Sequence, residues 1–114
     1  MKTVQVAIQD PVYADCIRTL LSEDGRHQVQ LVRKPDLNVA GVMILDAACL
    51  DCFSTPAREQ NRLIVMAHKR EDDLGILWDA GVRHVIFYGD PPERVRLAVL
   101  AMELSLSASK ANTA

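Results

Sequence analysis

Short apolar runs alternate with amphipathic segments along this chain. The runs at 42–45 and 63–67 are apolar throughout, which is typical of strands covered on both faces. The run at 27–32 alternates, with Val29 and Leu31 on one face, which favours a strand near a sheet edge. The pattern predicts five β-strands, at 4–8, 27–32, 42–45, 63–67 and 84–88.

The segments between these runs predict helices. Asp10 suits the N-cap of a helix over 11–23, and Pro11 suits its first turn. A second helix opens with acids at 71–73 and ends before Gly81. The last helix follows two prolines at 91–92 and runs to about residue 107. The expected apolar face of the first helix comprises Val12, Cys16, Ile17, Leu20 and Leu21.

Strands that alternate with helices require crossover connections, and so a parallel sheet. Five strands at this spacing predict an α/β, flavodoxin-like sheet with helices on both faces. Only residues 35–40 separate the second strand from the third, so the second crossover helix is shortened or absent. The expected domain spans 1–107 and is followed by a disordered tail at 108–114.

Composition narrows the class of protein. The 114 residues suit one domain, and 49% of them are apolar. A net charge of −2 gives no basic field for direct contact with nucleic acid. No apolar run is long enough for a membrane span or a signal peptide. We therefore expect a cytoplasmic protein whose three cysteines are reduced.

The last predicted helix has two apolar faces. One face is expected to pack on the sheet, and comprises Val95, Ala98, Val99, Met102 and Leu106. Leu97, Leu100 and Leu104 lie on nearly the opposite side, where a monomer normally carries polar residues. The alternative is that these are scattered surface leucines, which are common. We favour an interface, formed with a protein partner or in a homodimer.

Three motifs, in order along the chain, carry a resemblance to a known family. They are the run from Ile8 to Pro11 with the helix after it, the run from Val42 to Asp46, and Ala80-Gly81-Val82. Together they resemble the receiver (CheY-like) domain of bacterial response regulators, especially receivers attached to LuxR- or NarL-type transcription factors. The resemblance extends to about residue 107 and implies that Asp46 holds the phosphoacceptor position.

The resemblance also implies that most of the phosphorylation pocket is missing. The family's two magnesium-binding acids correspond to Ile8 and Gln9, and Asp10 falls one place later. The family's Thr or Ser at the end of the fourth strand is replaced by Ala67, and its Lys at the end of the fifth strand by Tyr88. The resemblance thus implies a degenerate receiver, a pseudo-receiver.

Three functions remain open on these residues. The first is a non-catalytic interaction module with no cofactor. The second is a working phosphorelay receiver in which Asp46 accepts phosphate and Asp10 helps to hold Mg²⁺. The third is a metal or redox protein built on Cys49 and Cys52, with His68 as a further zinc ligand. Two other histidines, His27 and His84, are expected to be edge or partly buried side chains and not ligands.

Overall fold

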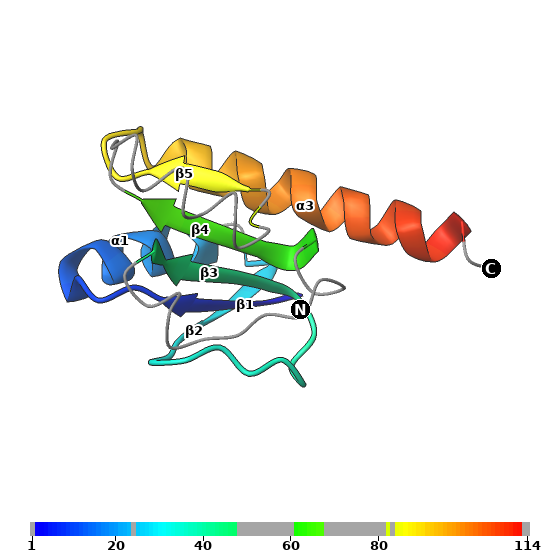
Figure 1. Ribbon diagram of the computed structural model, residues 1–114, viewed down its shortest axis with the longest axis horizontal. Helices are drawn as coiled ribbons and strands as arrows, with labels where there is room; N and C mark the ends of the chain where they lie inside the picture. The colour runs from blue at the N-terminus through cyan, green and yellow to red at the C-terminus, as the bar shows by residue number, and fades with distance from the viewer. Residues whose placement is uncertain (1, 24, 48–60, 68–81, 83, 113–114) are drawn as a thin grey trace.

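A computed structural model describes residues 2–23, 25–47, 61–67, 82 and 84–112 of the chain (Figure 1). Within these residues the elements follow one another in the order β1, α1, β2, β3, β4, β5 and α3. Their bounds are β1 Lys2–Ala7, α1 Pro11–Ser22, β2 His27–Leu31, β3 Val42–Asp46, β4 Leu63–Ala67, β5 Val85–Phe87 and α3 Glu93–Asn112. Neither described helix is long and apolar enough to cross a membrane.

The five strands form one parallel sheet in the order β2-β1-β3-β4-β5. This confirms the predicted flavodoxin-like arrangement, with β2 at an edge as its alternating pattern suggested. The central strands β3 and β4 are buried almost throughout, which explains why their sequences are continuous apolar runs. All five strands point the same way, so their carboxyl ends share one edge of the sheet.

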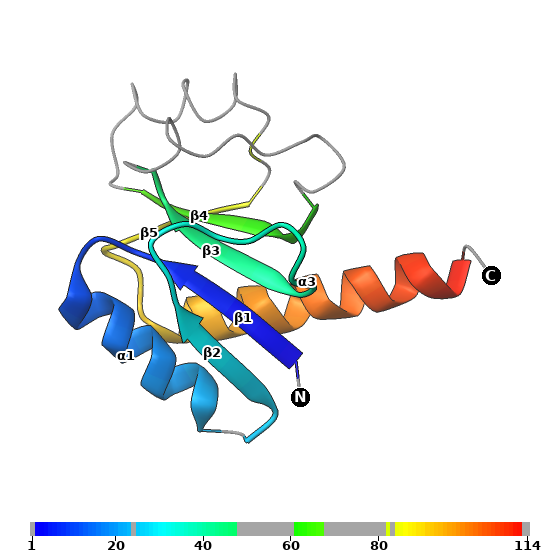
Figure 2. The same cartoon turned by 90° about the horizontal axis from the view of Figure 1, so that it is seen from below.

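Side chains that alternate along the strands fill two separate cores. The main core lies between the sheet and both described helices, α1 and α3, which pack on the same face (Figure 2). The core on the opposite face contains Met43, Leu45, Leu63, Val65 and Val82. The helix expected at 71–80 lies outside the described residues.

Asp10 begins helix α1 as predicted. Its carboxylate accepts the backbone N–H groups of Val12 and Tyr13, and Pro11 occupies the first turn. The predicted apolar face was partly wrong, because Val12 and Cys16 are exposed. At 100° per residue, Val12 lies roughly 140° from Ile17, which is at the centre of the buried face. The residues of α1 that are buried are Ala14, Ile17 and Leu21.

Helix α3 packs on the sheet through the predicted face. Val95, Val99 and Met102 are buried, and Ala98 and Leu106 are partly buried against the main core. The predicted end at residue 107 was wrong, because the helix continues to Asn112 and takes up 108–112 of the expected tail. In Figure 1 this C-terminal part of α3 extends past the sheet.

The connection between β2 and β3 confirms that the second crossover helix is absent. Residues 32–41, all of which are described, contain no helix. The side-chain amide of Gln5 donates to the carbonyl of Asp36 at 2.9 Å and accepts the N–H of Asp36 at 2.7 Å. Gly41 has a φ of 113°, and a Cβ at this position would collide with the carbonyl oxygen of Thr3.

Arg62, just before β4, also holds the connection between β2 and β3 in place. Its guanidinium is buried and donates to the carbonyls of Leu37, Val39 and Gly41, at 2.6, 2.7 and 2.9 Å. These carbonyls have no helical partners, so the arginine satisfies acceptors that a crossover helix would have satisfied internally. The connection is therefore held over the inner strands.

A buried ion pair or hydrogen bond joins β2 to α3 across the main core. His27 Nε2 donates to Glu103 Oε1 at 2.8 Å, and both side chains are buried. The prediction that His27 is an edge or partly buried side chain underestimated its burial, while His84 is exposed. Sequence pattern alone did not reveal Glu103, which lies on the core face of α3.

This pair should make a testable contribution to stability. We expect His27→Leu to lower the free energy of unfolding by about 3 kcal/mol, because it leaves the Glu103 carboxylate buried without this partner. Adding Glu103→Leu should recover most of that loss, since two apolar side chains replace the pair. Urea denaturation of both variants measures the two values. A double variant no more stable than His27→Leu would contradict this account.

Candidate functional site

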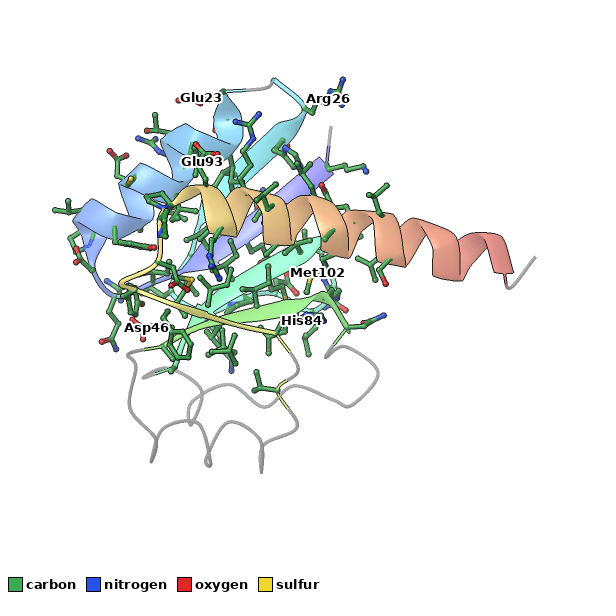
Figure 3. All side chains as sticks on the ribbon, turned by 90° about the horizontal axis from the view of Figure 1, so that it is seen from above. Glu23, Arg26, Asp46, His84, Glu93 and Met102 are labelled. Atoms are coloured by element: carbon green, nitrogen blue, oxygen red, sulfur yellow. The ribbon has the colours of Figure 1, made fainter. Side chains whose placement is uncertain are left out.

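The predicted pocket residues meet at the carboxyl edge of the sheet. Ile8, Gln9 and Asp10 follow β1, and Asp46 ends β3. Ala67 ends β4, and Tyr88 follows β5. Figure 3 shows Asp46 at the end of the sheet where α1 begins. In doubly wound sheets this edge is where sites form.

Asp46 lies partly buried at this edge, next to the segment after β1. Its Oδ2 accepts the backbone N–H of Gln9 at 3.5 Å, which is a long hydrogen bond. The Gln9 side chain is exposed, and Ile8 is partly buried against the main core. Next to Asp46, these two positions therefore supply an amide and an apolar side chain and no carboxylate.

Asp10, the candidate substitute ligand, has a structural role in this arrangement. Its Oδ1 accepts from Val12 N at 2.9 Å and from Tyr13 N at 3.3 Å. Through Oδ1, Asp10 therefore serves as the N-cap of α1. Among the described residues, no three His, Cys, Asp or Glu side chains gather to form a metal site.

The pocket position at the end of β4 is apolar. Ala67 is buried, and its methyl group cannot hydrogen-bond a phosphoryl oxygen. Its carbonyl accepts the N–H of Tyr88 at 3.1 Å, which continues the pairing of β4 with β5 by one residue.

Tyr88, which follows β5, places an aromatic ring at this edge of the sheet. Its ring packs edge-to-face on Tyr13 of α1, with centroids 5.0 Å apart and planes at 77°. Both rings are partly buried against the main core. Burial raises the pKa of the Tyr13 hydroxyl above 10.0, and the nearby Cys16 and Asp90 add to this shift. The site therefore has a neutral, aromatic wall.

Sequence analysis missed the contribution of Tyr13. Tyr13 is three residues after the N-cap Asp10, so it lies in the first turn of α1, close to the carboxyl edge of the sheet. This spacing could have identified Tyr13 as a residue of the site. Asp90 was likewise unassigned, and its Oδ2 accepts the N–H of Phe87 at 3.3 Å in the turn after β5.

The other predicted sites divide into two groups. Cys49, Cys52 and His68, the candidate zinc or redox residues, lie outside the described residues. On α3, by contrast, Leu97, Leu100 and Leu104 are 65%, 36% and 72% exposed. The outward-facing position of these leucines is therefore confirmed, and together they are called the leucine face below.

Comparison with known proteins identifies the fold. No protein-family model matches the chain, and no curated protein sequence matches it. Its structure is similar to a response regulator receiver domain from Clostridium thermocellum, with a TM-score of 0.69, 13% identity, and coverage of 95% of this chain and 98% of that one.

Two further solved structures are similar. The receiver domain of a Francisella response regulator has a TM-score of 0.68 and 16% identity, and the match covers 90% of this chain and 96% of that one. A CheY-like response regulator protein from Mesorhizobium loti has a TM-score of 0.65 and 16% identity, over 89% and 98% of the two chains. The chain therefore has the receiver fold.

The role of Asp10 can be tested by two substitutions. Asp10→Ala should lower the free energy of unfolding by about 1 kcal/mol, because α1 loses its cap, whereas Asp10→Asn should keep nearly full stability. Thermal unfolding of the wild type with and without Mg²⁺ should give the same midpoint. A magnesium-dependent rise that Asp10→Asn abolishes would show instead that Asp10 binds the cation.

Proposed function

We propose that this chain is a receiver-like signalling domain that acts by binding other proteins and not by accepting phosphate. The receiver fold supports the signalling class. The proposal that the domain does not accept phosphate rests on the edge-to-face packing of Tyr88 on Tyr13. An aromatic ring held in that way cannot supply the positive charge that the corresponding lysine gives to receivers.

Phosphoryl transfer to a carboxylate brings two anions together. A divalent cation and a fixed positive side chain normally offset the repulsion in the transition state. At about 4 Å, one such charge is worth roughly 4 kcal/mol at an effective dielectric near 20. Here Asp10 is engaged as a helix cap, while Ile8 and Gln9 supply no carboxylate. Losing these terms slows phosphorylation by orders of magnitude, since about 1.4 kcal/mol is tenfold in rate.

Direct phosphorylation tests the proposal. The protein is incubated with acetyl phosphate and Mg²⁺, and its intact mass is measured over time. We expect no phosphorylated species above the level seen for Asp46→Asn. An acyl phosphate that forms on the wild type and disappears in Asp46→Asn would establish the working receiver instead.

We further propose that the leucine face is the surface through which the domain binds a protein, in the first instance a second copy. The opposite side of α3 is fixed in the main core by Val95, Val99 and Met102. The leucine face is therefore presented on a rigid helix, so its side chains lose little conformational freedom on binding. Burying these leucines in both copies stabilises a dimer by several kcal/mol on a scale of about 1.5–3 kcal/mol per fully buried leucine.

Sedimentation velocity tests the leucine face. The wild type should form dimers, and Leu97→Glu with Leu100→Glu should weaken dimerisation roughly hundredfold, because charges replace apolar contacts. Val12→Glu is the matched control, since Val12 is 78% exposed but lies on α1. A wild type that remains monomeric at high concentration would exclude the homodimer.

A further inference from the structure

Strand β2 leaves one edge of the sheet open. Among the described strands it pairs only with β1, because it is the first in the order β2-β1-β3-β4-β5. An outer strand presents a row of backbone donors and acceptors that another chain can extend. The orientation of those groups follows from the hydrogen bonds at the two ends of β2.

At one end Lys2 donates its N–H to the carbonyl of Arg26, and at the other Val32 donates to the carbonyl of Val6. In a parallel pair, successive residues direct their backbone groups to opposite sides. Even-numbered residues from Arg26 to Val32 therefore face β1, and Val29 and Leu31 face outward. No described residue hydrogen-bonds the outward N–H and C=O groups of Val29 and Leu31.

This edge lacks the features that normally block strand addition. The stretch from Gln28 to Leu31 contains no charge, no proline and no glycine. Its register with β1 runs through five consecutive pairs without a bulge. Gln28 is exposed, and Leu31 is 46% exposed.

The described connection after β2, residues 32–41, does not cover the edge either. Gln5 and Arg62 hold residues 36–41 over the inner strands, and Val32 packs toward the core on that face. A crossover helix is absent from 32–41, so no described helix shields β2 on that side.

The charge at the carboxyl end of this edge is positive, although the whole chain has a net charge of −2. Arg33 and Lys34 come after β2, separated from it by Val32, and both are exposed. The next acid, Asp36, accepts the N–H of Asn38 with its Oδ1. The amino end carries both signs, because Glu23 and Asp24 precede Arg26 in the sequence, and Glu23 is exposed.

We propose that β2 binds an extended acidic polypeptide segment as a sixth strand. The outward backbone groups of Val29 and Leu31 supply the main-chain hydrogen bonds, and Leu31 supplies apolar contact. Arg33 and Lys34 select a segment with carboxylates beside them.

The test uses the full chain and a capped peptide of alternating Thr and Val with glutamates at both ends. Fluorescence anisotropy measures binding, and NMR measures amide hydrogen exchange. We expect saturable binding, with slowed exchange at the Val29 and Leu31 amides and little change at Gln28 and Gln30, which already bond to β1. No binding, or binding that leaves the Val29 and Leu31 amides unprotected, overturns the proposal.

Charge selection is tested with the same peptide carrying lysines in place of glutamates. Arg33→Glu with Lys34→Glu should weaken binding of the acidic peptide about tenfold, because two attractive pairs become repulsive. Equal affinity for the acidic and basic peptides overturns the stated partner chemistry.

The backbone contacts are tested with Leu31→Pro. This change removes an outward donor but no bond to β1, so the domain should stay folded and lose peptide binding. Leu31→Thr keeps the N–H and is the matched control. If Leu31→Pro unfolds the domain, the exchange measurement and the charge variant still decide the question. Dimers that Leu31→Pro abolishes, while Leu97→Glu with Leu100→Glu leaves them intact, would show that the occupant is a second copy.

Discussion

A parallel sheet must bury both of its faces, and this requirement shapes the whole domain. Its strands cannot be joined by tight hairpins, so each connection has to cross a face and cover it. Here the connection after β2 is too short to do so with a helix. Arg62 and Gln5 instead hold an irregular segment over the inner strands by bonding its backbone groups. The price is an outer strand that keeps less cover than its neighbours.

The sequence is adapted to that missing cover. Thr3 and Gln28 are register partners, as are Gln5 and Gln30, and residues paired in this way face the same side of the sheet. The face from which the helix is absent therefore carries polar side chains where an interior strand would carry apolar ones. Gln5 is buried and satisfies its amide on Asp36, whereas Gln28 is exposed. This polarity keeps the uncovered sheet compatible with water.

The carboxyl edge of the sheet is held together by contacts among the segments that meet there. Asp46 remains at the end of β3, but Asp10 caps α1 and the Tyr88 ring packs on Tyr13. These contacts stabilise the junction of α1, β1 and β5 and leave no cationic side chain at the position of Tyr88. Our two proposals therefore concern surfaces of the domain, which are the leucine face of α3 and the outer edge of β2.

Periodicity determined the five strands and the two faces of α3, because burial imposes a repeat of two on strands and about 3.6 on helices. The cap at Asp10 followed from residue type, since Asp suits the N-cap and Pro the first turn. Periodicity wrongly placed Val12 on the buried face of α1 and ended α3 too early, since the apolar pattern fixes neither the centre of a helix face nor its last turn. Only the tertiary structure brought His27 to Glu103 and Tyr88 to Tyr13. Such contacts join residues far apart in the chain, and no local pattern specifies which polar or aromatic side chains will meet once the sheet has formed.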